Sequence, residues 1–584
     1  MDPLIPRSLL FGNPDRAQPR VSPDGAWLSW LAPHEGVLNV WVAPWDDPGA
    51  AQPVTADRQR GIHNHAWSQS SAFLLFEQDL DGDENFVLFA VPPTGGEPRQ
   101  LTPSGARAQV IGTSPSRPDH LVVMVNDRVP ELMDPVLVEL RSGETTRLAE
   151  NTSAVGFVVD RRDLSLRVSV HMTAEGGSLW RFLGEDGREE PVGAEDVLTT
   201  SLVGIDVDGN EWWLDSRGRD TNALIRVRGS EREEVLSHPR GDIADVMEDA
   251  GGRPRAAWAV FAEREAMIVD PAVSAHLERL ATHREGTPVV TSSSTDDRCW
   301  VVGWHSSAGP VAYAAYDTAS GRVRDLFLDR TALADQPLAE RHPVVLRSRD
   351  GWDLVCYLTL PRWVETDAEG RPGEPLPMVL LVHGGPWWRD QPGYDGVHQL
   401  LANRGCATLS VNFRGSTGLG KRFLNAGDME WGGKMHDDLL DAVQAMVERG
   451  VADPDRVAIM GGSYGGYATL VGLTFTPDTF ACGVDIVGPS SLLTFMASIP
   501  PYWKPMKVQF HTRVGDDETE EGRAELWRRS PLSKVEQIRR PLLIAQGAND
   551  PRVKQAESDQ LVAELQRREI PVTYALFPDE GHGF

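Results

Sequence analysis

Positive charge and cysteine are scarce in this sequence, and each of these two scarcities excludes a class of protein; lysine is scarce as well. There are 85 acidic residues against 57 basic ones, a formal net charge of −28, so binding to nucleic acid or to an anionic membrane is not expected. Lysine is confined to the stretch from Lys421 to Lys554, a bias that we attribute to genome composition. The four cysteines form neither a CxxC pair nor a dense framework. We therefore expect buried free thiols and a cytoplasmic location.

Long hydrophobic runs are missing as well. No run of about eighteen apolar residues occurs, so no membrane span is predicted. The stretch from Met1 to Arg7 lacks a basic segment followed by an apolar one, and a signal peptide is not expected. The length of 584 residues exceeds one ordinary domain and favours two or three.

Short strand-like runs separated by turn clusters recur from about residue 20 to about residue 330. Residues 26–30 and 38–42 form one such pair, and residues 72–76 and 85–89 form another across a turn at 81–83. The units repeat roughly every 40 to 45 residues, the spacing of four-stranded propeller blades, and about seven of them fit. The sequence predicts a β-propeller; two stacked β-sandwiches are the alternative.

The pattern changes after about residue 340. Continuous apolar runs such as Val379–Val382 and Leu542–Ala545 alternate with helical patterns such as Asp437–Val447 and Gln555–Leu565. Alternation of this kind predicts a mostly parallel sheet covered on both faces. We therefore divide the chain into a propeller domain at 1–335, which includes an N-terminal extension, and an α/β domain at 336–584.

One hexapeptide in the second half carries a chemical signal. Residues Gly461–Gly466 fit G-x-S-x-G, and they lie between a β-rich run at 456–460 and a helical pattern at 467–471. This is the strand–turn–helix context of the nucleophilic serine in α/β-hydrolases. Glycines on both sides of Ser463 allow the chain to approach a strained backbone closely. The sequence therefore predicts an α/β-hydrolase domain with Ser463 as nucleophile.

A serine nucleophile needs a base, and the base needs an acid that orients it. In this fold the chain order is serine, acid, histidine, which selects His582 rather than His511. Asp550 follows the apolar strand at 542–545 and is the predicted acid. Asp579 shares a loop with His582, and Asp485 lies within a strand, so neither is preferred.

The developing oxyanion needs two hydrogen-bond donors. The amide of Tyr464, directly after the nucleophile, is one candidate. The second is expected from the glycine-rich loop His383–Trp388, where we prefer Gly385 over Gly384. No metal or other cofactor is required by this chemistry.

Together these features resemble the prolyl oligopeptidase family of serine peptidases, and especially its acylaminoacyl-peptidase and dipeptidyl-aminopeptidase-like members. The most specific matching segments are Asn412–Gly418, Gly461–Tyr467, Gln546–Val553 and Gly581–Phe584. The resemblance implies a propeller that screens a buried site and admits short peptides. It also implies a further helix after the histidine, whereas this sequence ends at Phe584, so we expect either a truncated or an unusually closed domain.

The resemblance also suggests residues that bind substrate. Arg552 is similar to the family arginine that binds a backbone carbonyl of the substrate. The segment Gly488–Lys504 corresponds to the region that builds the S1 pocket, with Phe495, Tyr502 and Trp503 as candidate lining residues.

Three other motifs carry weaker signals. The run Gly415–Lys421 nearly fits a phosphate-binding loop, but Arg422 stands where a serine or threonine is required. Residues Asp79–Glu84 read as a hairpin turn, and Asp83 or Glu84 there is a candidate ligand for a free substrate amine. The motif His63–His65 offers two of the three ligands that a metal would need.

The favoured function is thus a serine peptidase on short peptides, acylaminoacyl-peptidase-like or oligopeptidase-like. The alternatives are a dipeptidyl or aminopeptidase that acts on free N-termini, a small-molecule esterase or amidase, and a non-catalytic propeller scaffold. The sequence leaves assembly into a homo-oligomer open.

Overall fold

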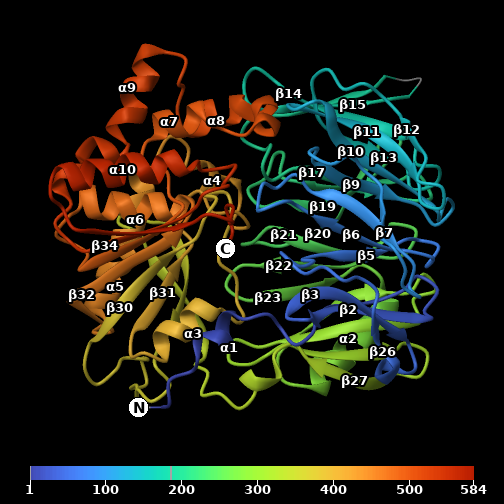
Figure 1. The fold of residues 1–584 in the computed structure, drawn as a ribbon, viewed down its shortest axis with the longest axis horizontal. Coiled ribbons are helices and arrows are strands. Elements are labelled where there is room, and N and C mark those ends of the chain that lie inside the picture. The colour runs from blue at the N-terminus through green and yellow to red at the C-terminus, as the bar shows by residue number, and fades with distance from the viewer. Residues whose placement is uncertain (1, 185–186) are drawn as a thin grey trace.

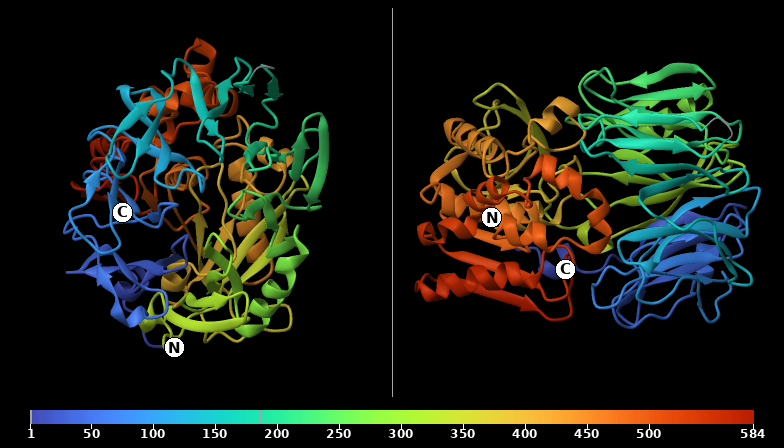
Figure 2. Two further views of the ribbon diagram at one scale, coloured as in Figure 1. Left: turned by 90° about the vertical axis from the view of Figure 1, so that its right-hand side faces the viewer. Right: turned by 90° about the horizontal axis from the view of Figure 1, so that it is seen from above.

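The computed structural model describes residues 2–184 and 187–584, and the chain folds into two parts that face each other (Figure 1). Within these described ranges, seven small antiparallel sheets make up one part, and one eight-stranded sheet with its helices makes up the other. Figure 2 shows the two parts side by side, with the C-terminal end of the chain between them. The predicted propeller and α/β-hydrolase domains are both confirmed.

Each propeller blade is a meander of consecutive strands. The first four blades are β1 (Ala17–Val21) to β4 (Gln52–Pro53), with β2 (Trp27–His34) and β3 (Val37–Pro44); β5 (His65–Trp67), β6 (Leu74–Gln78), β7 (Val87–Val91) and β8 (Arg99–Gln100); β9 (Ala108–Thr113), β10 (His120–Val129), β11 (Leu132–Glu139) and β12 (Thr145–Arg147); and β13 (Ala154–Val159), β14 (Leu166–Met172), β15 (Ser178–Phe182) and β16 (Glu189–Val192).

Blades 5 and 7 have four strands like the first four blades, whereas blade 6 has three. The remaining blades are β17 (Ser201–Ile205), β18 (Glu211–Asp215), β19 (Ala223–Arg228) and β20 (Glu231–Ser237); β21 (Ile243–Glu248), β22 (Pro254–Val260) and β23 (Arg264–Ile268); and β24 (Thr287–Ser293), β25 (Cys299–His305), β26 (Ala312–Asp317) and β27 (Arg322–Leu328). Helix α2 (Pro271–His283) follows the three strands of blade 6. Its N-cap is Asp270, whose side chain accepts from the amide of Ala272, and proline occupies its first position.

Apolar side chains hold neighbouring blades together. Leu31 and Val40 of blade 1, for example, pack in one buried cluster with Leu74 and Phe76 of blade 2. The ring closes between blades 7 and 1, where the amide of Val21 donates to Ser292 Oγ at 2.8 Å. No strand is shared across this closure among the described residues, because each sheet is built from consecutive strands.

The eight-stranded sheet has the order β28-β29-β31-β30-β32-β33-β34-β35, and its last six strands are parallel. They are β28 (Arg341–Arg347), β29 (Asp353–Thr359), β30 (Leu376–Val382), β31 (Ala407–Val411), β32 (Ala452–Gly462), β33 (Cys482–Ile486), β34 (Leu542–Gly547) and β35 (Val572–Phe577). The helices of this part are α3 (Gly396–Ala402), α4 (Lys421–Asn425), α5 (Lys434–Glu448), α6 (Tyr464–Phe475), α7 (Leu492–Ala497), α8 (Lys507–Arg513), α9 (Glu520–Arg528) and α10 (Gln555–Arg567).

The N-terminal segment lies against the hydrolase part. Helix α1 (Arg7–Phe11) packs against α3, and the amide of Ile5 donates to Asn403 Oδ1 at 2.7 Å. Ile5 and Leu10 share a buried cluster with Leu333 and Leu338 of the segment that leaves the propeller. The two connections therefore run together, and the domain division at residue 335 remains a prediction.

No helix among the described residues is long and apolar enough to cross a membrane.

Candidate functional site

The predicted nucleophile lies on a sharp turn between β32 and α6. Ser463 has φ 58° and ψ −118°, a conformation that is strained for a residue with a side chain. Its amide donates to the carbonyl of Ile486 at 2.8 Å, which ties the turn to the neighbouring strand β33. The turn therefore exposes the serine at the carboxyl edge of the parallel strands, where ligand sites form.

Two glycines around Ser463 have no room for a side chain. A Cβ atom on Gly461 would lie 2.5 Å from the carbonyl oxygen of Val382, and one on Gly465 would lie 2.1 Å from the same oxygen. A Cβ on Gly462, by contrast, would meet no atom closer than the carbonyl oxygen of Ile486 at 3.9 Å. Close backbone approach, rather than flexibility, therefore dictates glycine at 461 and 465.

This difference gives a matched pair of variants. Gly465→Ala is expected to destabilise the protein by at least about 1–3 kcal/mol, the usual cost of overpacking, because the Val382 backbone must move. Gly462→Ala is expected to retain the wild-type melting temperature within a few degrees. Thermal unfolding of the two variants side by side checks this, and equal melting temperatures would contradict the packing described here.

The predicted acid and base are hydrogen-bonded. His582 Nδ1 lies 2.7 Å from Asp550 Oδ2, and the Asp550 carboxylate is fully buried. Its other oxygen accepts from the amides of Arg552 at 2.8 Å and Val553 at 2.9 Å. A carboxylate only accepts, so Nδ1 of His582 carries the proton and Nε2 is left to accept one. Ser463 and His582 line the same cavity, but no hydrogen bond joins their side chains among the described residues.

The loop that carries His582 is held from both parts of the molecule. The amide of Asn549 donates to the carbonyl of Glu580 at 2.9 Å, and the Asn549 side chain donates to the carbonyl of Asp81 in the propeller at 3.0 Å. A Cβ on Gly82 would lie 2.4 Å from the amide nitrogen of Gly581. The turn between β6 and β7 thus presses directly against the residue before the histidine.

The predicted oxyanion donors lie beside the serine. The Tyr464 amide is in the first turn of α6, where a helix leaves its N–H groups without intrahelical acceptors. Across the cavity, a Cβ on Gly384 would lie 3.4 Å from that of Ser463, and Gly384 and Gly385 both line the cavity. The loop and the first turn of α6 therefore approach the nucleophile from two sides.

A buried histidine fixes this loop. His383 Nδ1 lies 2.8 Å from the carbonyl oxygen of Gly384, and its Nε2 lies 2.9 Å from Ser416 Oγ. Burial lowers the pKa of His383 to about 4, so the imidazole is neutral at pH 7. The ring also stacks on Phe413 at 4.5 Å, which in turn stacks on Tyr464. These three stacked rings connect the loop to α6.

A cavity of about 410 Å³ opens beside Ser463, and its lining is mostly apolar and rich in aromatic side chains; we call it the aromatic cavity. The predicted residues Phe495 and Trp503 line it, whereas Tyr502 lies outside the lining and donates from its hydroxyl to Glu84 at 3.1 Å. Four further large apolar side chains of the lining, which come from separate loops and helices, were not predicted: Trp387, Trp431, Met506 and Phe510. The cavity suits a large apolar side chain.

Glu84 of the propeller does not line this cavity itself but contacts Arg552, a lining residue at its rim. Its carboxylate lies 2.8 Å from Arg552 Nε and 3.6 Å from Arg107 Nη1, and its side chain is 11% exposed. Arg552 lines the cavity two residues after Asp550. Of the two acids that the hairpin offered, Glu84 is the one at the rim, since Asp83 accepts from the amides of Leu80 and Asn85 within the turn itself.

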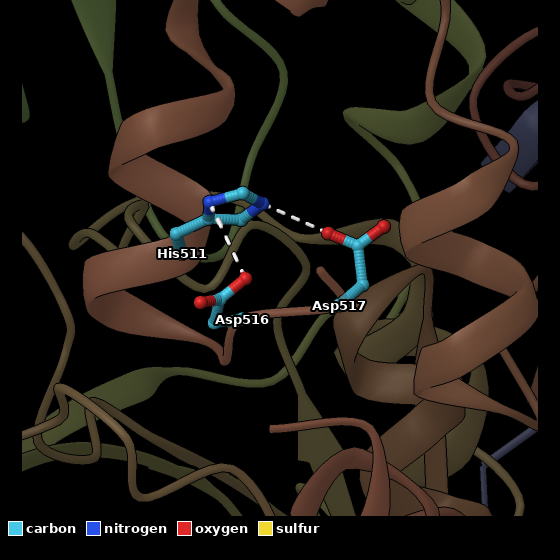
Figure 3. A group of neighbouring side chains, drawn as sticks. All are labelled: His511, Asp516 and Asp517. Carbon is cyan, nitrogen blue, oxygen red and sulfur yellow. Dashed lines mark hydrogen bonds and ion pairs between the residues drawn. The ribbon is translucent and has the colours of Figure 1, made fainter. Parts of the chain in front are cut away.

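The rejected histidine belongs to a separate polar cluster. Figure 3 shows His511 between Asp516 and Asp517, at 3.7 Å and 2.8 Å respectively. Lys507 Nζ lies 3.0 Å from the Asp517 carboxylate and compensates its charge. These contacts tie α8 to the loop that follows it. The cluster has the residue types of a metal site, but its groups already satisfy one another.

The motif His63–His65 does not gather ligands. His65 is buried with its Nε2 2.9 Å from Ser29 Oγ, and burial lowers its pKa to about 3. His63 is exposed at the surface.

Asp485 lies beneath the nucleophile turn. Its Oδ1 accepts from the amide of Gly488 at 2.9 Å, and its Oδ2 has no protein partner among the described residues. Burial raises the pKa of this carboxyl to about 8. The group is therefore mostly protonated in the native state at pH 7.

This shift predicts a pH dependence of stability. The unfolded chain loses the Asp485 proton near pH 3.9, whereas the native state keeps it until about pH 8. Between these values the native state binds more protons, so the free energy of unfolding falls as pH rises, by up to about 1.4 kcal/mol per pH unit. Asp485→Asn is expected to raise the melting temperature, relative to wild type, more at pH 8 than at pH 5. A shift that is independent of pH would contradict this.

Comparisons with known proteins agree with the geometry. The model of the prolyl oligopeptidase family matches residues 392–584. Dipeptidyl aminopeptidase BIII of Pseudoxanthomonas mexicana is 49% identical over the whole chain and 86% of its own length. Dipeptidyl peptidase family member 6 of Caenorhabditis elegans is 34% identical over 99% of the chain and 84% of its own length.

A solved structure shows the same fold. A puromycin-hydrolysing peptidase of Mycobacterium tuberculosis superposes with a TM-score of 0.74 at 20% identity, and the match covers all of this chain and 93% of that one. The family model and the relatives above agree with the geometry of the nucleophile turn. This chain therefore belongs to the prolyl oligopeptidase family of serine peptidases.

Proposed function

We propose that this protein is a dipeptidyl aminopeptidase, which releases dipeptides from peptides with a free, protonated N-terminus. The observation that carries the proposal is the Glu84 carboxylate at the rim of the cavity, beside Arg552. A carboxylate that is largely removed from water binds an ammonium group strongly. Two relatives that match nearly the whole chain are named as a dipeptidyl aminopeptidase and a dipeptidyl peptidase family member, which supports the same choice.

The proposed mechanism gives each residue one role. Ser463 attacks the scissile carbonyl carbon while His582 Nε2 takes its proton, and Asp550 holds the imidazole and stabilises the imidazolium. The amides of Tyr464 and Gly385 donate to the oxyanion. The imidazolium returns the proton to the leaving amine as the C–N bond breaks. Water then attacks the acyl-enzyme, with His582 as base, and releases the dipeptide.

Substrate binding follows from the positions of the polar groups. The N-terminal ammonium pairs with Glu84, and Arg552 donates to a backbone carbonyl of the substrate. The side chain of the second residue enters the aromatic cavity beside Phe495 and Trp503. In this proposal the hairpin of Glu84, which contacts Arg552, ends the path after the second residue before the scissile bond.

Removing the charge of Glu84 tests the proposal. Glu84→Gln is expected to lower kcat/KM for dipeptidyl substrates with a free amine by about 10- to 150-fold, the worth of a charge-assisted hydrogen bond. For the same substrates with an acetylated amine, the change is expected to be within about twofold. Glu97→Gln, which changes an exposed acid on the same blade, is the matched control.

Product analysis separates this function from its rivals. Mass spectrometry of a digested free-amine hexapeptide is expected to show dipeptides released in succession from the N-terminus. Preferential cleavage of the acetylated peptide would favour an acylaminoacyl peptidase, and internal fragments would favour an oligopeptidase; either result would overturn the proposal.

A further inference from the structure

A solvent-exposed tryptophan, Trp388, ends the loop that carries the predicted oxyanion donor Gly385. Trp388 is 63% exposed, although its neighbour Trp387 lines the aromatic cavity. Its backbone is fixed, because its amide donates to the carbonyl of Pro386 at 2.8 Å and its carbonyl accepts from the amide of Thr417 at 3.0 Å. A Cβ on Gly385 would lie 3.1 Å from the Cβ of Trp388. The indole therefore begins directly beside the predicted oxyanion donor.

Trp388 lines a second cavity, of about 260 Å³, that does not include Ser463. Blades 5 and 6 form one wall, with Ser201 and Asn222 of blade 5 and Ile243 of blade 6, and the hydrolase loops form the other, with Gln391 and Thr417. The two parts meet here through backbone contacts, since the amide of Asp242 donates to the carbonyl of Gly418 at 3.0 Å. Hydroxyl and amide groups beside a solvent-exposed indole suit an extended peptide, which offers both backbone polar groups and side chains.

Glu84 and the second cavity lie toward different sides of the propeller ring. Glu84 follows β6 in blade 2, whereas the second cavity lies against β17 of blade 5 and β21 of blade 6. In a closed ring of seven consecutive blades, blades 5 and 6 face blade 2 across the axis. A path from Glu84 past Ser463 and Gly385 therefore continues toward Trp388.

From this order we propose that Trp388 and the second cavity bind the leaving peptide, that is, the first residues on the C-terminal side of the scissile bond. The inference rests on the proposed function, because the ammonium at Glu84 sets the direction in which the substrate lies. The aromatic cavity holds the residue before the scissile bond, and Gly385 separates the two sites. The indole of Trp388 packs against the leaving chain as it crosses between the domains.

A series of leaving groups tests this inference. The substrates share one free-amine dipeptide and carry an amide, one, two or three further residues, so that the leaving group grows from ammonia to a tripeptide. In the wild type, kcat/KM is expected to rise with the length of the leaving peptide. In Trp388→Ala, kcat/KM is expected to fall by roughly 2- to 12-fold for the longer peptides, the range for an aromatic contact, and to stay unchanged for the dipeptide amide.

Control variants guard against a general defect. Trp527→Ala removes another exposed tryptophan, 44% exposed on α9, and should leave the whole series unchanged. Trp388→Phe should recover most of the loss. Labelling of Ser463 by a fluorophosphonate at the wild-type rate shows that the neighbouring oxyanion loop is intact in Trp388→Ala. An equal loss for every member of the series would overturn the inference.

The same series with acetylated N-termini keeps the two proposals apart. The ratio of kcat/KM for free-amine substrates to kcat/KM for acetylated substrates reports on Glu84. The dependence of kcat/KM on leaving-group length reports on Trp388. If the wild type shows no preference for a free amine while kcat/KM still rises with the length of the leaving peptide, the proposed function alone is contradicted. A normal amine preference without any length effect in the wild type would contradict the site at Trp388.

Discussion

Ser463→Ala is expected to lower kcat for peptide substrates by about 10⁴- to 10⁶-fold, the largest effect of any single substitution in this chain. Without the hydroxyl no acyl-enzyme can form, and only stabilisation of the oxyanion by the proposed donors, the amides of Tyr464 and Gly385, would remain. The strained backbone at 463 is enforced by its neighbours rather than by the hydroxyl, so the fold is expected to persist.

Single-turnover and steady-state kinetics with a free-amine dipeptidyl substrate measure this loss, and thermal unfolding supplies the control. The melting temperature of Ser463→Ala should match that of the wild type. Peptide turnover within about 100-fold of the wild-type rate would show that another residue supplies the nucleophile.

Asp550→Asn is expected to lower kcat by about 10⁴-fold, with little change in KM. The amides of Arg552 and Val553 both donate to Oδ1 of residue 550, and they will hold the side-chain oxygen of asparagine in that place. The asparagine NH₂ then faces His582 Nδ1, which must accept instead of donate. The proton moves to Nε2, and the imidazole can no longer take the proton of Ser463.

Asp579→Asn is the matched control, because Asp579 is the other acidic residue near the histidine that the sequence offered. Its kcat is expected to lie within about threefold of the wild-type value. Comparable losses in the two variants, or a tenfold loss or less in Asp550→Asn, would remove Asp550 from the role proposed for it.

The nucleophile turn and its partners were predictable because each has a local signal. Ser463, Asp550 and His582 all follow strands at the carboxyl edge of one parallel sheet, and parallel strands bring such residues together. Both parts of the fold were predictable for the same reason, from a blade spacing and from an alternation of apolar runs with helical patterns. The absence of a fourth strand in blade 6 was not predicted, although Asp270-Pro271 has the form of a helix start.

The substrate side of the site was less predictable, because it is assembled from distant segments. Glu84 belongs to a turn whose local signal is only that of a hairpin, and its carboxylate meets Arg552 through the docking of one domain on the other. Trp387, Trp431 and Phe510 come from three separate loops and helices and share no periodicity. Tyr502 was assigned to the cavity from its place in the chain, but its ring lies under Arg107, 4.7 Å from the guanidinium carbon.

The most direct test of the account is the site of reaction with a fluorophosphonate. Incubation of the intact protein with the probe, followed by digestion and mass spectrometry, identifies the residue that attacks phosphorus. We predict a single modification, on Ser463, which Asp550→Asn slows and Ser463→Ala abolishes. No labelling of the wild-type protein, or labelling of a different serine, would contradict the assignment of Ser463 as the nucleophile.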